Sequence, residues 1–265
     1  MQNALIAALG KDFPWAQHLH YYESVTSTNL LAKEMAAKGA PHGTVLLASH
    51  QTAGRGRLGR SFHSPENSGL YLSLLLRPQC NAEALMHLTC TAAVASCDAL
   101  EAACGHRPGI KWTNDLVWGT RKLGGILTEL GWTGDGRLAY AIVGIGINRT
   151  QQPQDFPPEL QSMAASVSMM AGKSVEALPL ATQMLLSLYK MDQNMLSGKA
   201  AMMETYRKDC ITLSKDICVL SGDTVQYGQA LDVDEQGGLT VRFTDGTVRT
   251  VAAGEVSVRG MYGYV

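Results

Sequence analysis

The segment at residues 54–60, with the sequence GRGRLGR, constrains this chain more than any other. It places three arginines and three glycines in seven residues, and no Asp or Glu occurs between Glu34 and Glu66. Glycines let the backbone approach a ligand closely, and arginines add planar positive charge that suits phosphate and carboxylate oxygens. The segment therefore predicts a loop that closes over a polyanion, although a solvated Arg/Gly surface loop would have the same composition.

The same residues spell G-x-G-x-x-G, the phosphate-binding pattern of dinucleotide folds. Such folds place a helix directly after the glycines and an acidic residue about 20 positions further on. Here residues 61–65 read as a turn, and residues 74–80 hold no carboxylate. The sequence therefore disfavours a dinucleotide-binding fold.

Composition excludes several classes of protein. The 265 residues are 46% hydrophobic and 17% charged with a net charge of −1, which is typical of a globular protein and not of a dedicated nucleic-acid binder. No apolar run is long enough to span a bilayer, and residues 1–10 lack the features of a signal peptide. We therefore expect a cytoplasmic protein.

The six cysteines form no metal or redox motif. None belongs to a C-x-x-C pair, and no histidine lies near them at zinc-ligand spacing. Cys90, Cys97 and Cys104 are seven residues apart, which places them on one face of a helix. Buried, reduced thiols are the expected state.

Apolar periodicity predicts an α+β fold with a mixed sheet. Strands are expected at residues 44–49, 70–76, 123–132 and 137–147, and helices after Ser27 and over residues 81–104, 178–197 and 200–210. A Pro/Gln-rich connector covers residues 151–158, and five short strands follow from Ile217, which predicts a small SH3-like barrel. The expected domains are residues 1–212 and 213–265.

A second informative region combines the segment KWTND at residues 111–115 with RKLGGIL at residues 121–127. Lys122 follows a predicted hairpin turn at residues 119–120, so a strand would hold its charge in a fixed position. Gly124 and Gly125 interrupt this apolar strand. Either a bulge or the close approach of a ligand would explain them.

Several polar residues allow two interpretations each. Asp115 beside Asn114 suits a Mg²⁺ ion on phosphates, or a capped turn. Asn148 ends a strand and either contacts an adenine edge or only completes the strand. Among residues 27–29, Ser27 is placed to cap a helix, while the other two would line a pocket or face water.

In this order, the segments resemble the biotin–protein ligases, the biotin–[acetyl-CoA-carboxylase] ligase family. Residues 51–60 resemble the signature loop of the family, residues 111–115 its KWPND segment with Thr113 in place of proline, and residues 121–127 its lysine motif. The similarity runs from about Ser24 to Asn148 and more weakly to residues 254–259. It implies a class II synthetase-like catalytic domain followed by the barrel.

The resemblance also implies a two-step reaction. A biotin carboxylate oxygen would attack the α-phosphorus of ATP, with Mg²⁺, to give biotinyl-5′-AMP and pyrophosphate. A lysine of the biotin carboxyl carrier protein would then attack the mixed anhydride and release AMP. No protein nucleophile is required, and a loop that excludes water would protect the intermediate.

Site residues follow from the matching motifs. Those implied to bind biotin are Ser27, Thr28, Asn29, Gln51, Arg55, Gly56, Arg57, Lys122, Gly124 and Gly125. Those implied to bind ATP are Arg57, Arg60, Lys111, Asn114, Asp115 and Asn148, with Asp115 the one candidate ligand for Mg²⁺. Lys122, Arg55 and Arg57 would be catalytic because they bring positive charge to the reacting phosphate. Under this interpretation the two strand glycines make room for biotin.

Other expectations concern partners and rival functions. About twenty residues precede the similarity, so the resemblance implies the short form without a DNA-binding domain. A monomer or weak homodimer is expected. No nucleic-acid or membrane partner is expected. The rival hypotheses are a lipoate or octanoate ligase of similar fold and a non-catalytic sensor of biotin or a nucleotide.

Overall fold

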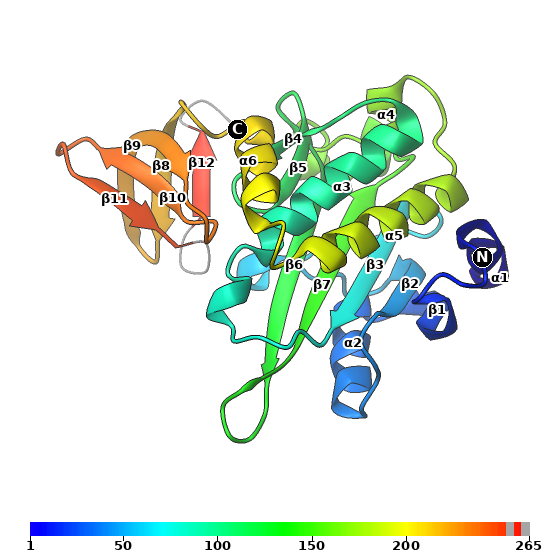
Figure 1. Cartoon of the computed structure of the whole chain (residues 1–265). Coiled ribbons are helices and arrows are strands. Elements are labelled where there is room, and N and C mark those ends of the chain that lie inside the picture. The colour runs from blue at the N-terminus through cyan, green and yellow to red at the C-terminus, as the bar shows by residue number, and fades with distance from the viewer. Residues whose placement is uncertain (253–256, 261–265) are drawn as a thin grey trace.

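The computed structural model describes residues 1–252 and 257–260, which form a large α+β body and a smaller body of β-strands (Figure 1). The helices are α1 (Gln2–Leu9), α2 (Thr28–Ala37), α3 (Leu88–Cys104), α4 (Val167–Ala171), α5 (Ala177–Asn194) and α6 (Lys199–Asp209). Short 3₁₀ turns are η1 (Ala16–His18), η2 (Arg57–Gly59), η3 (Glu83–Leu85), η4 (Pro153–Asp155) and η5 (Pro158–Leu160). The α+β fold predicted from the sequence is confirmed.

The large body is built on a seven-stranded mixed sheet. Its strands are β1 (Leu19–Val25), β2 (Thr44–Gln51), β3 (Gly69–Leu76), β4 (Gly109–Lys111), β5 (Asp115–Trp118), β6 (Arg121–Trp132) and β7 (Leu138–Asn148). They lie in the order β1-β2-β3-β7-β6-β5-β4, with β1 and β2 parallel and every other pair antiparallel. The predicted strands and the hairpin turn before Lys122 are confirmed.

The two faces of this sheet are covered differently. Helices α3, α5 and α6 pack on one face and bury the main hydrophobic core (Figure 1). On the opposite face, α2 covers part of the sheet through Ala32 and Ala36, which contact Leu46, Leu75 and Ile142. The rest of that face, over β6 and β7, is left for a functional site.

Small side chains let α3 pack closely within the core. Its alanines and the three predicted cysteines, Cys90, Cys97 and Cys104, are buried, and all six cysteines of the chain are reduced. Burial raises the pKa of the Cys90 thiol to about 12, which makes it a poor nucleophile at neutral pH. The expectation of inert, buried thiols is confirmed for this helix.

The predicted start of α3 is wrong. A helix was expected from residue 81, but α3 begins at Leu88 and the preceding residues form the turn η3. The Asn81 side chain accepts a hydrogen bond from the backbone N–H of Ala84, so a local side-chain contact replaces the first helical turn. Periodicity alone did not reveal this stop.

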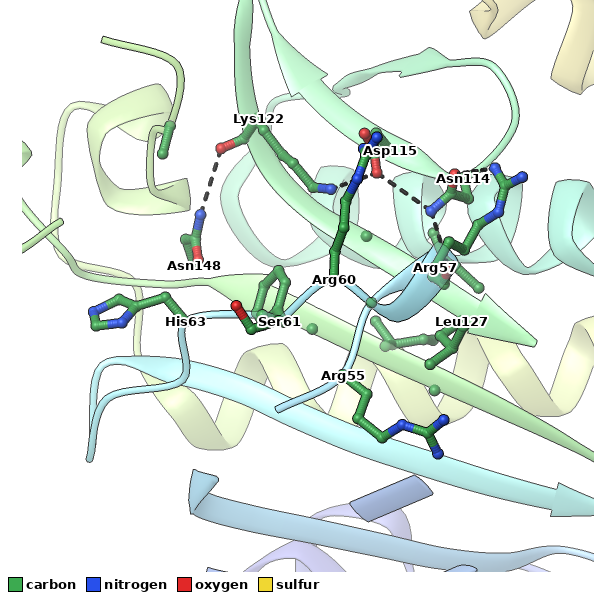
Figure 2. A pocket seen from close by; sticks show the side chains of 18 of the residues that line it. Arg55, Arg57, Arg60, Ser61, His63, Asn114, Asp115, Lys122, Leu127 and Asn148 are labelled. Carbon is green, nitrogen blue, oxygen red and sulfur yellow. Dashed lines mark hydrogen bonds and ion pairs between the residues drawn. The ribbon is translucent and has the colours of Figure 1, made fainter. Parts of the chain in front are cut away.

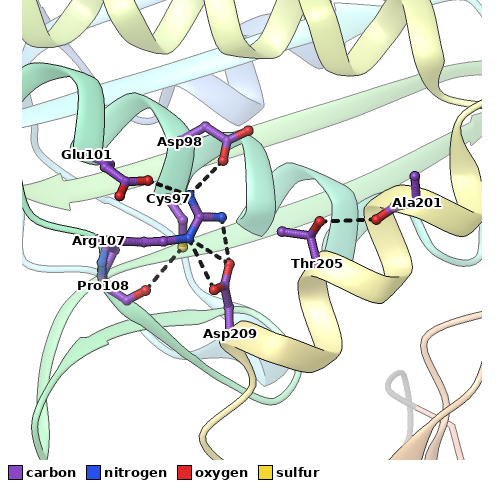
Figure 3. Close-up of polar contacts among 8 residues, drawn as sticks. All are labelled: Cys97, Asp98, Glu101, Arg107, Pro108, Ala201, Thr205 and Asp209. Carbon is purple, nitrogen blue, oxygen red and sulfur yellow. Dashed lines mark hydrogen bonds and ion pairs between the residues drawn. The ribbon is translucent and has the colours of Figure 1, made fainter.

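Arg107 ties α3 to α6 at the end of the sheet that carries β4. Its guanidinium contacts Asp98 and Glu101 on α3 and Asp209 at the end of α6, at 2.8, 2.9 and 2.6 Å (Figure 3). The contact with Asp209 is bidentate, from Nε to Oδ1 at 3.1 Å and from Nη2 to Oδ2 at 2.6 Å, a geometry that strengthens an arginine–carboxylate pair. It fixes α6 directly before the chain enters the second body.

The second body is an antiparallel sheet of five short strands, as predicted. They are β8 (Asp216–Ser221), β9 (Thr224–Val233), β10 (Leu239–Phe243), β11 (Val248–Val251) and β12 (Ser257–Gly260), in the order β11-β10-β9-β8-β12. Residues 254–256 of the weaker C-terminal similarity lie outside the described part of the chain. The domain boundary at residues 212 and 213 stays a prediction.

The turn between β9 and β10 contacts the large body. The Trp112 indole Nε1 donates to the Gly237 carbonyl at 2.9 Å, and this bond is buried. Arg207 of α6 donates to the Val233 carbonyl and to Glu235, each at 2.6 Å. The second body is therefore held against the KWTND segment by directional bonds. Among the described residues no helix has the length and apolar character needed to cross a bilayer.

The buried His87 gives a testable pH dependence of stability. Its ring is 0% exposed, and Nε2 lies 2.8 Å from the Met195 carbonyl. Burial lowers the pKa of His87 below 6.5 and outweighs the opposing effect of this hydrogen bond. Between the folded pKa and 6.5 the unfolded chain binds more protons, so the free energy of unfolding should fall as pH drops through that window.

The variant His87→Gln cannot titrate but can still donate to Met195. Urea unfolding followed by circular dichroism between pH 7.5 and 5 should therefore show a weaker pH dependence for this variant than for the wild-type chain. Parallel curves for the two proteins would contradict the expectation.

Candidate functional site

A cavity of about 690 Å³ lies on the face of the sheet that carries α2, beneath the glycine-rich segment at residues 54–60. Gly125 and Leu127 of β6 and their cross-strand partners on β7, Gly146 and Gly144, line it from the sheet. It gathers nearly all residues that the sequence singled out. The predicted residues that line it are Ser27, Thr28, Asn29, Gln51, Arg55, Gly56, Arg57, Arg60, Lys111, Asn114, Asp115, Lys122, Gly125 and Asn148.

Gly124 is the one predicted site residue that does not line the cavity. A Cβ there would lie 2.4 Å from the Gly146 carbonyl oxygen, so this glycine permits close contact with β7. The pairing of β5 with β6 also skips Leu123, which is a bulge. A Cβ on Gly125, in contrast, would lie 3.2 Å from Asp115 Oδ1 and 3.3 Å from Lys122 Nζ. A bulge is therefore present beside this glycine pair and Gly125 lines the cavity, while the close approach of a ligand stays a prediction.

One wall of the cavity is neutral and polar. The backbone N–H and the hydroxyl of Thr28 donate to Gln51 Oε1 at 2.9 and 3.1 Å. Asn29 Nδ2 donates to the Leu127 carbonyl at 3.2 Å, and Asn29 Oδ1 accepts from Ser73 at 2.6 Å. Thr28, Asn29 and Ser73 are buried and Gln51 is half-buried, and the four side chains orient one another, so they form a fixed set of hydrogen-bonding groups.

The expected cap by Ser27 is wrong in its chemistry. Ser27 occupies the N-cap position of α2 but makes no capping hydrogen bond. Gln51 of β2 instead accepts from the first helical N–H, that of Thr28. The Ser27 side chain, 1% exposed yet lining the cavity, is thereby left available to a ligand.

Two glycines of β7 create room for this wall. A Cβ on Gly144 would lie 2.0 Å from Asn29 Oδ1, and one on Gly146 would lie 2.6 Å from the Phe62 ring. Both glycines fall within the strand expected at residues 137–147, and no role was predicted for either. Their alternation with Ile145 was the available signal, because it exposes backbone on one face only.

The other wall is cationic (Figure 2). Among the described lining residues, Arg55, Arg57, Arg60, Lys111 and Lys122 carry positive charge and Asp115 is the one carboxylate. Lys122 Nζ lies 2.5 Å from Asp115 Oδ1, and Arg57 donates to Asn114 Oδ1 at 2.9 Å. Burial lowers the pKa of Arg57, but a guanidinium still keeps its proton near neutral pH. The wall attracts an anion with more than one charge.

The glycine-rich segment is closed mainly on itself. The Gly56 N–H donates to the Arg60 carbonyl at 2.7 Å, and Arg55 pairs with Ser61 in an isolated bridge. Between them Leu58 has a φ of 55° and is 58% exposed at the cavity edge. An exposed leucine in this strained conformation marks the tip of a loop rather than part of the core.

Residues 156–165 form a strap over Lys122 that the sequence analysis missed. The Lys122 N–H donates to the Met163 carbonyl, the Ala165 N–H donates to the Lys122 carbonyl, and Asn148 Nδ2 donates to the Ala165 carbonyl. Phe156, Leu160 and Met163 line the cavity from this strap. The connector expected at 151–158 therefore contains the start of a cavity wall. The spacing of Phe156, Leu160 and Met163 in and after this connector was the available signal.

Asp115 is the side chain that was predicted to bind a metal ion. Its Oδ1 accepts from Lys122 and from Asn114 Nδ2, the latter at 3.3 Å. The described residues contain no group of three or more His, Cys, Asp or Glu side chains placed to hold a metal ion. One carboxylate fits a Mg²⁺ ion that takes most of its oxygen ligands from a phosphate chain and water.

Known proteins share this architecture. Residues 21–148 match the biotin/lipoate A/B protein ligase family, and residues 216–259 match the biotin protein ligase C-terminal domain. The bifunctional ligase/repressor BirA of Bacillus subtilis is 36% identical over 89% of this chain and 73% of its own length. The biotin–[acetyl-CoA-carboxylase] ligase of Mycobacterium tuberculosis is 31% identical over 87% of this chain and 84% of its own.

A solved structure agrees with these relatives. The biotin protein ligase of Aquifex aeolicus, in complex with biotin and ATP, superposes with a TM-score of 0.78 at 28% identity. The match covers 92% of this chain and 99% of that protein. Both bodies of the present fold therefore occur together in a protein that holds a carboxylic acid and a nucleotide.

Gly144→Ala tests the close packing of the polar wall. Because the new Cβ would overlap the Asn29 side chain, we expect the free energy of unfolding to fall by about 1–3 kcal/mol. Gly134→Ala is the matched control, since that glycine lies in an exposed turn with no atom within 4 Å of a new Cβ. Its effect should stay within about 0.5 kcal/mol. Equal midpoints of thermal unfolding for both variants would contradict this account.

Proposed function

The chain belongs to the biotin protein ligase family, and on that premise we propose that it is an ATP-dependent ligase that attaches biotin to a lysine of a biotin carboxyl carrier protein. The observation that carries the proposal is the meeting of two walls in one cavity. A neutral hydrogen-bonding wall suits the ureido ring of biotin, and a wall of five cations suits its carboxylate and the phosphates of ATP.

The first step joins two anions. An oxygen of the biotin carboxylate attacks the α-phosphorus of ATP, the bond from phosphorus to the bridging oxygen breaks, and pyrophosphate leaves. Both reactants carry negative charge, so nearby cations must offset their repulsion. Lys122, held 2.5 Å from Asp115 on a strand, offers such a charge in a defined position, and Arg55 and Arg57 add to it.

A divalent cation completes this charge balance. Mg²⁺ bound to the phosphates would neutralise part of their charge, and Asp115 with Asn114 are the residues placed to help hold it.

The second step needs an acyl-adenylate that has survived hydrolysis. The neutral amine of the acceptor lysine attacks the carbonyl carbon of the mixed anhydride, an amide forms, and AMP leaves with the oxygen of the broken C–O bond. Residues 54–60 lie over the cavity with Leu58 at their tip, which suits them to exclude water until the acceptor arrives.

Several finer expectations stay predictions. They are the cytoplasmic location, the monomeric or weakly dimeric state, and the absence of a nucleic-acid partner. The roles of individual site residues also belong to the proposal, and variants must test them.

Biotin-dependent exchange of labelled pyrophosphate into ATP tests the adenylation step directly. With the purified chain and Mg²⁺ we expect exchange with biotin and none with lipoate at equal concentration, because the polar wall offers fixed partners to a ureido group. Exchange with lipoate but not with biotin would change the substrate assigned to this chain and leave its fold assignment unchanged. No exchange with either acid would favour a non-catalytic sensor.

Lys122→Ala tests the role of the lysine in the first step. Loss of one preorganised charge at the reacting phosphate should lower the exchange rate by roughly 10²–10³-fold. Biotin affinity, measured by calorimetry without ATP, should fall much less. Arg121→Ala is a control that removes a neighbouring cation outside the described cavity lining, and it should leave the rate nearly unchanged. A normal rate in Lys122→Ala would remove this lysine from the mechanism.

A further inference from the structure

Glu129 of β6 lies behind the neutral wall and meets three groups that belong to it or border it. Its Oε1 lies 2.6 Å from Lys33 Nζ and 3.5 Å from Arg55 Nη1, and its Oε2 accepts from Asn29 Nδ2 at 2.9 Å. The side chain is 16% exposed and is not among the described residues that line the cavity. Glu129 therefore contacts the site residues without facing a ligand itself.

A continuous chain of hydrogen bonds runs from Glu129 across the wall. The Ser73 hydroxyl is shared between Asn29 Oδ1 at 2.6 Å and Thr28 Oγ1 at 2.8 Å. Thr28 donates to Gln51 Oε1, Gln51 Nε2 donates to Ser64 at 2.9 Å, and Ser64 donates to the Phe62 carbonyl at 2.9 Å. The chain thus starts at a carboxylate on the sheet and ends just after the glycine-rich segment.

The two ends of this chain fix its direction. An ionised carboxylate can only accept, so Asn29 must turn its Nδ2 toward Glu129 and its Oδ1 toward Ser73. A backbone N–H can only donate, so Gln51 must turn its Oε1 toward Thr28 and its Nε2 toward Ser64. The Leu127 carbonyl, which can also only accept, holds the same Nδ2 at 3.2 Å, so the carboxylate is the shorter of two contacts that orient the Asn29 amide.

Glu129 is held in its charged form. Burial alone would raise its pKa, but the hydrogen bonds from Lys33 and Asn29 and the charge of Arg55 outweigh burial and keep the pKa below its usual value. The same carboxylate lies 3.5 Å from Arg55 near the start of the glycine-rich segment, while Gln51, which precedes the segment, bonds to Ser64, which follows it. Both ends of the segment are therefore connected through one network.

We infer that Glu129 is a positioning residue for biotin: together with the Leu127 carbonyl it holds the Asn29 amide in one orientation, and it couples the polar wall to the glycine-rich segment through Arg55. The inference rests on the proposed function only in naming biotin as the ligand. It predicts that a bound ligand and an ordered segment stabilise each other, because both depend on the same orientation of Asn29, Thr28 and Gln51.

Glu129→Gln tests the inference, because it removes the charge and the acceptor-only character while keeping the size of the side chain. Calorimetry with biotin alone should show a dissociation constant raised about tenfold, the effect of one misdirected hydrogen bond. Trypsin cleavage at Arg55, Arg57 and Arg60 should lose most of the protection that biotin gives the wild-type chain. Lys33→Met is the matched control: it breaks the ion pair but leaves the carboxylate and the chain, and both readouts should stay within twofold of wild type.

Either of two results would overturn the inference. One is wild-type biotin affinity and protection in Glu129→Gln, and the other is an equal loss in Lys33→Met, which would assign the effect to the ion pair. Ser73→Ala interrupts the same chain at a residue outside the described cavity lining, so it must also weaken binding and protection even if Glu129→Gln does not fold. A wild-type chain that binds no biotin would instead contradict the proposed function.

Discussion

The site depends on a patch of sheet that carries almost no side chains. Gly125, Gly144 and Gly146 lie next to one another on β6 and β7, and each is closely approached from above. Asn29 takes the space over Gly144, the Phe62 ring takes that over Gly146, and the pair of Lys122 and Asp115 lies beside Gly125. A methyl group at Gly144 or Gly146 would overlap the Asn29 side chain or the Phe62 ring, and one at Gly125 would crowd the pair of Lys122 and Asp115.

Above this patch, the cationic side chains give the cavity a net positive charge. Close cations repel one another, and local partners hold three of the five in place. Lys122 is paired with Asp115, Arg57 is held by the neutral amide of Asn114, and Arg55 is paired at longer range with Glu129 outside the described lining. Two of these partners are carboxylates, yet the cations of the lining still outnumber its acids. The net field therefore favours a polyanion, which is the requirement for bringing a carboxylate to a triphosphate.

Sequence could predict the parts of the site that are written in short segments. Residues 27–29, 51–60, 111–115 and 121–127 each carry several chemically informative residues in a row, and the fold brings them to one cavity. Ser73 and Glu129 could not be found this way, because each is a lone polar residue in an apolar strand whose importance lies in distant partners. The strap at 156–165 was missed for the opposite reason, since its few apolar residues are embedded in a polar, proline-rich segment that resembles a linker.

The KWTND segment and the glycine-rich segment differ in how they are held, and this difference suits them to different tasks. The KWTND segment is fixed from far along the chain: Trp112 bonds to Gly237 through its indole and to Thr212 through its backbone, and the Tyr206 hydroxyl donates to the Thr113 carbonyl. The glycine-rich segment has mostly internal bonds, and its chief links to the rest of the site pass through Gln51, Arg55 and Arg57. A rigid wall suits the phosphates, which must be aligned with a carboxylate within fractions of an ångström. A segment with mostly internal bonds and few links to the rest of the site suits a cover that must close over the intermediate and later admit an acceptor.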